Sequence, residues 1–302
     1  MALELTQLEM AERAEGAPAE QASSGPAWLW ALLRPPFILC APAALFLALF
    51  FLAPLGLVIW TSVSEPQFGL GNYVEVFTSA YDLAVLARTF ETAAIVTAAA
   101  LVFAYPVAYV AARRGGRVGA LLLGIVALSF WTSFLVRTYA WMVILGARGS
   151  VVGLLVALGV TPAPRLLFTT FAATFAMAHM LVPFMVLALY AVMKRIDETH
   201  MRAAASLGAR PFTSFFTVYL PQRLPGILNG ATLVFITCLG FYVTPTLIGS
   251  PQDKMIASRI GQEIEQLLDF GAASATSMIL LAAAVALFVI YDRLFGLEKM
   301  WG

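Results

Sequence analysis

Long runs of apolar residues, separated by shorter polar segments, dominate the chain from residue 37 onward. Six of them reach the length of about 20 residues that a helix needs to cross a lipid bilayer. They cover residues 37–63, 88–111, 119–145, 167–193, 223–249 and 273–296. None alternates apolar and polar residues with the period of two that marks a membrane-spanning strand. The pattern predicts an all-α, polytopic membrane protein with six transmembrane helices.

The composition points the same way. Of 302 residues, 61% are hydrophobic and 12% are charged, and the mean hydropathy is +0.87. A soluble domain carries about 25% charged residues, so this chain lacks the polar side chains that cover a water-exposed globule. Cys40 and Cys238 both fall in apolar runs and have no metal-ligand spacing, so no metal site is expected. The net charge of +1 gives no argument for a nucleic-acid partner.

The positions of Lys and Arg predict the orientation of the spans. With a cytoplasmic N-terminus, 12 of the 18 Lys and Arg side chains fall inside, 5 fall outside and Arg137 lies within a span. Because positive charge is retained on the cytoplasmic side, both termini are expected there. The chain then divides into a cytoplasmic tail, residues 1–34, and a six-helix domain in contact with lipid, residues 35–302.

The cytoplasmic connection at residues 194–222 is much longer than the about 2–8 residues usual between packed helices. Acids, then alanines, then a glycine followed by a proline predict a short helix over residues 197–208. Its candidate contact residues are Asp197, Met201, Arg202, Ala203, Ala204, Leu207, Gly208 and Ala209. Such a helix fits either the groove of a partner protein or the lipid surface, and the residues alone leave both open.

Polar side chains within the spans are candidates for a translocation path. Glu91 either pairs with Arg88 one turn away or lies at the mouth of a path for cations. Arg137, about 27 Å along its span, either snorkels to the outer interface or forms a gate contact. Acids of the outer loop at residues 250–272 are expected to be solvated. The candidate path residues are Glu91, Arg137, Tyr139, Trp141, Asn229, Thr237, Tyr242 and Thr244.

The cytoplasmic connection resembles the EAA loop of ABC-importer permeases, in which Glu-Ala-Ala precedes Gly-Ala and a later Phe, Val and Leu-Pro. The matching residues are Ala203, Ala204, Gly208, Ala209, Phe215, Val218, Leu220 and Pro221. Arg202 stands where the family has Glu. Residues 137–141 and 241–249 are similar to segments of spermidine/putrescine-type permeases, and the resemblance extends from the second span to the C-terminus.

This resemblance implies a type I ABC-importer permease (MetI-like) fold in a bacterial inner membrane. It makes the 197–208 helix a coupling helix for a cytoplasmic ABC ATPase, present in two copies. A second homologous permease and a periplasmic or extracellular solute-binding protein would complete the complex. The chain is expected to bind no cofactor, since it has no phosphate-binding loop; ATP and Mg would be used by the ATPase. The expected solute is a polyamine or a related small organic cation.

Other functions fit the sequence less well. A permease for a different small solute would share the same signatures. A self-contained secondary transporter often shows paired repeats and buried ionisable residues for ion coupling. Spans without such residues fit this class poorly, and the 194–222 connection would have no role in it. An intramembrane enzyme would need a motif such as His-Glu-x-x-His or Gly-x-Ser-x-Gly, and the chain has neither. We therefore expect a transport subunit and not an enzyme.

Overall fold

The structure is a computed structural model that describes residues 35–194, 199, 204, 206–214, 217 and 220–295. All regular elements in these ranges are helices. Contacts within the chain divide it after Gly56 into two units.

The first unit contains α3 (Pro35–Leu47) and a π-helical turn, η1 (Ala48–Leu52). The π turn precedes Pro54, which has no amide hydrogen to donate to the carbonyl of Phe50. The amide of Ala53 instead donates to the carbonyl of Ala48, five residues back. Helix α4 (Ala53–Ser64) starts here and continues into the second unit.

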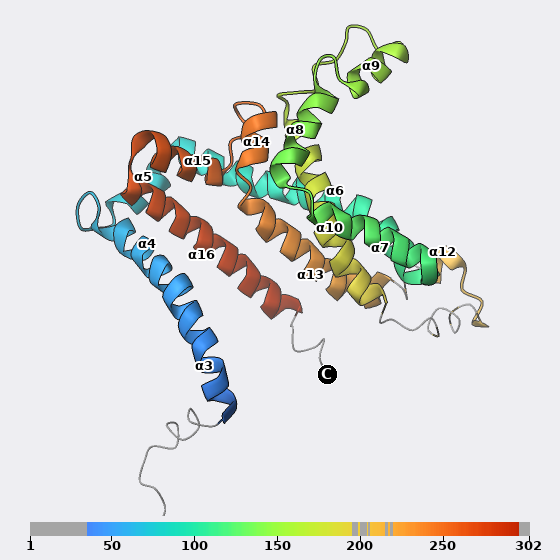
Figure 1. The fold of residues 1–302 in the computed structure, drawn as a ribbon, viewed down its shortest axis with the longest axis horizontal. Helices are drawn as coiled ribbons and strands as arrows, with labels where there is room; N and C mark the ends of the chain where they lie inside the picture. The colour runs from blue at the N-terminus through green and yellow to red at the C-terminus, as the bar shows by residue number, and fades with distance from the viewer. Residues whose placement is uncertain are drawn as a thin grey trace, which may run out of the picture. The chain divides into compact units, whose positions relative to one another are not determined.

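The remaining helices belong to the second unit (Figure 1). They are α5 (Gly71–Thr78), α6 (Ala80–Arg114), α7 (Gly116–Phe130), α8 (Phe134–Leu145), α9 (Ser150–Ala157), α10 (Thr170–Met193), α12 (Pro211–Ser214), α13 (Leu220–Leu239), α14 (Val243–Ile248), α15 (Ile256–Gln262), the π-helical η3 (Glu263–Leu267) and α16 (Phe270–Phe295).

Five helical segments in the described part of the chain are long and apolar enough to cross a membrane. They are Cys40–Ser64, Ala80–Arg114, Phe134–Ala157, Thr170–Met193 and Phe270–Arg293. Two shorter apolar helices, Gly116–Phe130 and Gly226–Leu239, accompany them. These lengths confirm the predicted helical membrane fold.

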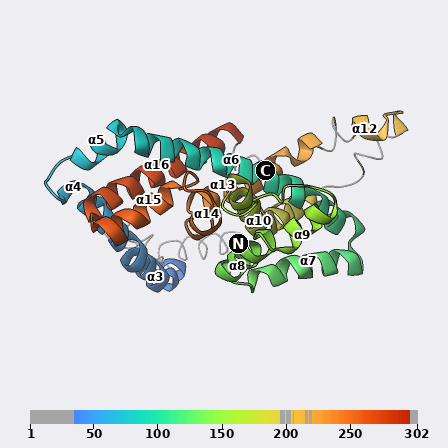
Figure 2. The same cartoon turned by 90° about the horizontal axis from the view of Figure 1, so that it is seen from above.

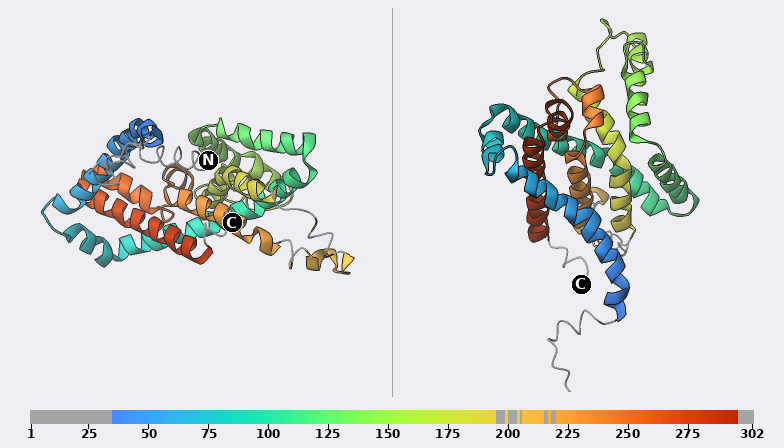
Figure 3. Two further views of the ribbon diagram at one scale, coloured as in Figure 1. Left: turned by 90° about the horizontal axis from the view of Figure 1, so that it is seen from below. Right: turned by 60° about the vertical axis from the view of Figure 1, so that its left-hand side comes forward.

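Helices α6, α10 and α13 form the core of the second unit. Figure 3 shows α10, α13 and α16 side by side, with α6 crossing them. Helix α6 contributes a stripe of fully buried small residues that includes Ala93, Ala100, Ala104 and Ala108. Small side chains let helix backbones approach closely, which is the usual way that helices associate inside lipid.

Helix α13 meets α10 through two glycines spaced four residues apart. A Cβ atom on Gly226 would lie 2.4 Å from a methyl of Val192, and one on Gly230 would lie 3.0 Å from the sulfur of Met185. This Gly-x-x-x-Gly spacing permits the close approach of the two helices.

Two of the expected spans are not continuous helices, which corrects the sequence prediction. The run at 119–145 is interrupted between α7 and α8, at residues 131–133, and α7 packs back along α6 (Figure 2). The run at 223–249 is interrupted between α13 and α14, at residues 240–242. Both interruptions lie within apolar sequence, so hydropathy alone does not reveal them.

Candidate functional site

The interruption between α13 and α14 leaves helix ends inside an apolar run. The amide of Gly240 donates to the carbonyl of Thr237 at 3.3 Å, and that of Phe241 donates to Cys238 at 3.0 Å. These tight bonds close the last turn of α13. Carbonyls at the C-terminal end of a helix carry partial negative charge, so the end of α13 favours cations.

A pocket of about 330 Å³ opens at this interruption. It is lined by Phe134, Thr237, Gly240, Phe241, Tyr242, Val243 and Thr244. Three predicted path residues, Thr237, Tyr242 and Thr244, therefore meet at one site. The rings of Phe134 and Phe241 pack edge to face, with centroids 5.9 Å apart. The lining contains aromatic rings, hydroxyls and a helix C-terminus but no charged side chain, a combination that suits weak binding of an organic cation.

Hydrogen bonds between threonines hold α14 at the pocket. The buried hydroxyls of Thr138 on α8 and Thr244 on α14 lie 3.1 Å apart. Thr138 also bonds the carbonyl of Phe134 at 2.9 Å, and the Thr244 hydroxyl lies 3.5 Å from the sulfur of Met180 on α10. Helix α8, which follows the first interruption, and helix α14, which follows the second, are thus bonded to each other, and α14 also contacts α10 in the core.

Arg137 is buried against the interruption between α7 and α8. Its Nη2 donates to the carbonyl of Thr132 at 3.0 Å, and its guanidinium lies 4.8 Å from the ring centre of Phe134. Only 9% of the residue is exposed. The guanidinium thereby provides a hydrogen-bond donor for the Thr132 carbonyl at the interruption after α7. It also contacts the ring of Phe134, which lines the pocket.

The distance predicted for Arg137 along an unbroken helix does not apply, because α7 ends before this residue. Ser129 donates its hydroxyl to the carbonyl of Val126, and the amides of Trp131 and Thr132 make short i to i−3 bonds. Hydroxyl residues compete with regular helical bonding in this way. The interruption therefore follows from the cluster of serine and threonine at residues 129–133.

The other predicted aromatic residues differ in environment. The indole nitrogen of Trp141 donates to Nδ1 of His179 at 3.3 Å, and its ring packs against Phe175 with centroids 5.0 Å apart. His179 is thus a packed histidine. Tyr139, on the same helix, is 55% exposed.

Asn229 and Glu91 do not join this pocket. The hydroxyl of Tyr291 on α16 donates to Oδ1 of Asn229, which makes this amide an interhelical contact. Glu91 is exposed and forms no ion pair or hydrogen bond with any described residue. The expected Arg88 pair is absent within the described ranges, since Arg88 donates to the carbonyl of Gln252.

The segment at residues 250–272 packs partly against the core, and its acids differ: Glu265 and Asp269 are exposed, as expected, whereas Asp253 and Glu263 are buried. Asp253 is buried; it accepts a hydrogen bond from Thr170 at 2.7 Å and one from the amide of Ser250 at 2.6 Å. The amide of Ile256 donates to the hydroxyl of Thr89 on α6 at 2.9 Å. The loop is therefore tied to both α10 and α6.

An ion-pair cluster missed by the sequence reasoning joins the start of α6 to α15 and η3. Nε of Arg259 lies 3.1 Å from a carboxylate oxygen of Asp82 and 3.2 Å from one of Glu263. Only 2% of Glu263 is exposed. Burial raises the pKa of this carboxyl, while Arg259 acts to lower it. Because Asp82 and Arg259 are 177 residues apart in the sequence, no local sequence pattern predicts their contact.

The connection at residues 194–222 is described only in part. Asp197, Met201, Arg202 and Ala203 lie outside the described residues.

Among the described residues of this connection, Gly208 has a φ of +81°, and the amide of Ala209 donates to the carbonyl of Ala204 at 3.1 Å. This is the 6→1 bond of a glycine-terminated helix end. The predicted helix end at Gly208 is confirmed, and it leaves Leu207 87% exposed.

Comparison with solved structures shows the fold. The structure aligns with a chain of a bacterial ABC transporter that imports the acidic polysaccharide alginate. The TM-score is 0.66 at 17% sequence identity, covering 88% of this chain and 98% of that one. At this identity the alignment establishes the fold of an ABC-importer permease.

Sequence comparison identifies the family. Residues 104–297 match the binding-protein-dependent transport system inner membrane component family, and the chain belongs to it. It is 33% identical over 223 residues to the spermidine/putrescine transport system permease protein PotB of Haemophilus influenzae, covering 73% of this chain and 77% of that protein. It is 31% identical to PotB of Escherichia coli K12, covering 75% and 82%. The protein is therefore a permease component of an ABC importer.

Proposed function

We propose that this permease imports polyamines such as spermidine and putrescine, or a related small organic cation. The observation that carries the proposal is the pocket at the interruption after α13. The aromatic and hydroxyl lining of this pocket and the C-terminal end of α13 match an alkylammonium group. In addition, the two PotB relatives of this chain are named for spermidine and putrescine transport.

The absence of a carboxylate in the pocket lining fits a translocation path. A path must bind its cargo strongly enough to admit it and weakly enough to release it. Ring faces and carbonyl dipoles give such weak attraction, whereas a buried carboxylate would retain a polycation. Strong capture is then the task of a separate solute-binding protein.

Energy would come from two copies of a cytoplasmic ATPase that uses ATP and Mg, acting on this chain and a second homologous permease. The helix at residues 197–208 would transmit ATPase closure, with Leu207 as an exposed apolar contact. Both termini would lie in the cytoplasm. A compensating acid on the ATPase would face Arg202, the residue that replaces the family's glutamate.

The test is uptake of labelled spermidine and putrescine by proteoliposomes that contain the native complex, its binding protein and internal ATP. Uptake that requires ATP supports the proposal. Transport of a different solute, with no polyamine uptake, would overturn it.

Ring removal at the pocket tests the site. Tyr242→Leu should lower uptake severalfold, and Tyr242→Phe should retain most of it, because the phenyl ring preserves the attraction for cations. Phe77→Leu, which removes an exposed ring on α5 away from the pocket, is the matched control. Equal uptake by Tyr242→Leu and the wild type would contradict the assigned path.

A further inference from the structure

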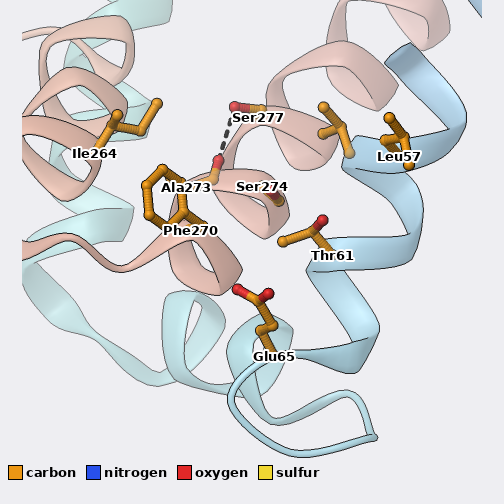
Figure 4. Close-up of a pocket in the computed structure, with 9 residues that line it drawn as sticks. Leu57, Thr61, Glu65, Ile264, Phe270, Ala273, Ser274 and Ser277 are labelled. Atoms are coloured by element: carbon orange, nitrogen blue, oxygen red, sulfur yellow. Dashed lines mark hydrogen bonds between the residues drawn. The ribbon is translucent and has the colours of Figure 1, made fainter. Parts of the chain in front are cut away.

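A second pocket, of about 350 Å³, lies between the end of α4 and the start of α16 (Figure 4). Residues spaced three and four apart on each helix form its two walls. They are Leu57, Val58 and Thr61 on α4, and Phe270, Ala273, Ser274 and Ser277 on α16; Glu65 and Ile264 complete the lining. In the proposed topology this pocket opens on the outer side of the membrane.

Glu65 is the one charged residue in the lining. Its carboxylate is drawn pointing into the space between Thr61 and Phe270 (Figure 4). That carboxylate forms no ion pair or hydrogen bond with any described residue. Glu65 is exposed, so a carboxylate without a partner among the described residues lies at the edge of this pocket, beside its apolar walls.

The backbone around Glu65 is fixed in place. Nδ2 of Asn72 donates to the carbonyl of Glu65 at 2.7 Å and to that of Ser62 at 3.1 Å. A Cβ atom on Gly271 would lie 2.4 Å from the Glu65 carbonyl oxygen, so the start of α16 packs directly against it. The carboxylate is thus presented by a built turn and not by a loose loop.

We propose that this pocket binds a primary ammonium group carried on an apolar chain, with Glu65 as its counter-ion. An ammonium has three donors and no acceptor. The carboxylate of Glu65 and the hydroxyls of Thr61 and Ser277 are acceptors, since the Ser277 hydroxyl donates to the Ala273 carbonyl and keeps its lone pairs free. Leu57 and Phe270 offer the apolar surface for the attached chain.

Other ligand classes fit poorly. An anion would meet Glu65 with no cation in the lining to bind it. A calcium ion takes six to eight oxygen ligands, and the described residues contain no cluster of acids that could hold a metal. The ammonium could come from the headgroup of phosphatidylethanolamine or from an alkylamine in solution, and the two sources share the same recognition chemistry.

The test uses the native complex in nanodiscs of two compositions. Discs of phosphatidylglycerol and phosphatidylethanolamine are analysed by native mass spectrometry for retained phosphatidylethanolamine. Discs of phosphatidylglycerol alone are tested for binding of labelled putrescine by equilibrium dialysis, without the binding protein. Retention in the first identifies the lipid as the source, and binding in the second identifies the solute.

Glu65→Gln should weaken whichever ligand binds by about tenfold, as expected for loss of a charge-assisted hydrogen bond. Glu75→Gln, an exposed acid on α5 outside the pocket, should bind as the wild type does. Ser274→Leu keeps the charge but fills the pocket, and should abolish binding. Equal binding by Glu65→Gln and the wild type, or no ligand in either disc, overturns the inference.

The inference is independent of the proposed solute. Uptake of polyamine by the wild-type complex is measured in parallel, and the melting temperature of each variant is measured to confirm folding. Uptake without a ligand in this pocket would remove the inference alone. Retained phosphatidylethanolamine without polyamine uptake would remove the proposed solute alone.

Discussion

The hydroxyls of Thr138 and Thr244 lie 3.1 Å apart and join α8 and α14, the helices that follow the two interruptions. Both residues are buried, and each sits beside the pocket after α13. A bond of this kind makes movement of α14 depend on movement of α8. We regard it as the contact that keeps the two interruptions in register.

Thr244→Val keeps the side-chain shape and removes this bond. Thr138 still donates to the carbonyl of Phe134, so no buried donor is left unpaired and the loss should be about 1 kcal/mol. The melting temperature of the purified complex should fall and uptake should decrease. Thr78→Val, which removes an exposed hydroxyl on α5, is the control. Unchanged melting and uptake in Thr244→Val would show that the bond has no such role.

Arg137 should prove to stabilise the interruption between α7 and α8. Arg137→Met keeps the apolar stem but loses the bond to Thr132 and the contact with Phe134, at a cost of about 1–3 kcal/mol. Amide hydrogen exchange at residues 131–133 should then accelerate. Arg148→Met, on the segment between α8 and α9, is the control. Unaltered exchange at the interruption would contradict the assigned role.

The sequence predicts the class of fold well because long apolar runs have few alternatives in a membrane. It does not predict the interruptions, since Trp131 and Phe241 keep both runs apolar while the backbone changes course. The available signals are local: hydroxyl residues at 129–133 and Gly240. Membrane helices tolerate hydroxyl residues and glycine so often that these residues do not by themselves indicate a break in a helix.

The candidate site was predicted in part. Thr237, Tyr242 and Thr244 meet at one pocket because they lie close together in the sequence. Phe134 was missed, as it comes from a distant helix that only the fold brings to the same place. Glu91 is a candidate by its charge alone, and charge does not indicate which residues lie near it in the fold.

The glycine pair on α13 makes a prediction about stability. Gly226→Ala places a methyl within 2.4–2.5 Å of the Val192 side chain, and should destabilise the complex by about 1–3 kcal/mol. A second change, Val192→Ala, should restore much of the loss by making room. Gly124→Ala on α7 has nothing within 4 Å and should be neutral or slightly stabilising. The melting temperature in detergent is measured for the wild type, Gly226→Ala, the double variant with Val192→Ala, and Gly124→Ala. Equal losses of stability in Gly226→Ala and Gly124→Ala would contradict the packing argument.

Glu263 should make stability depend on pH. Burial raises its pKa above the value in the unfolded chain, so the folded state binds more protons between the two values. The contribution of Glu263 to the free energy of unfolding should therefore be largest below the unfolded-state pKa and fall as the pH rises through the folded-state pKa.

Glu263→Gln should remove this slope, whereas Glu265→Gln, an exposed acid two residues away, should keep it. The readout is the melting temperature of the complex from about pH 4 to pH 8, which brackets the ordinary glutamate pKa of about 4.3. Parallel curves for the wild type and Glu263→Gln would assign the pH dependence to other groups.

Gly208 offers a test of coupling that leaves the membrane domain intact. Its φ of +81° is one that residues with a Cβ adopt at a cost of about 1–2 kcal/mol, and proline cannot adopt it at all. Gly208→Pro should therefore abolish most uptake and solute-stimulated ATPase activity, while insertion into the membrane stays normal. Gly208→Asn should be mild, because asparagine also ends helices in this conformation.

A third variant separates helix geometry from contact with the ATPase. Leu207→Ala keeps the helix end at Gly208 but removes the most exposed apolar side chain of the described loop residues. It should weaken recovery of the ATPase with the permease and reduce uptake to a similar extent. Loss of uptake in Gly208→Pro with full ATPase recovery would indicate that docking survives and that transmission fails. Normal uptake in both variants would remove the coupling role from this loop.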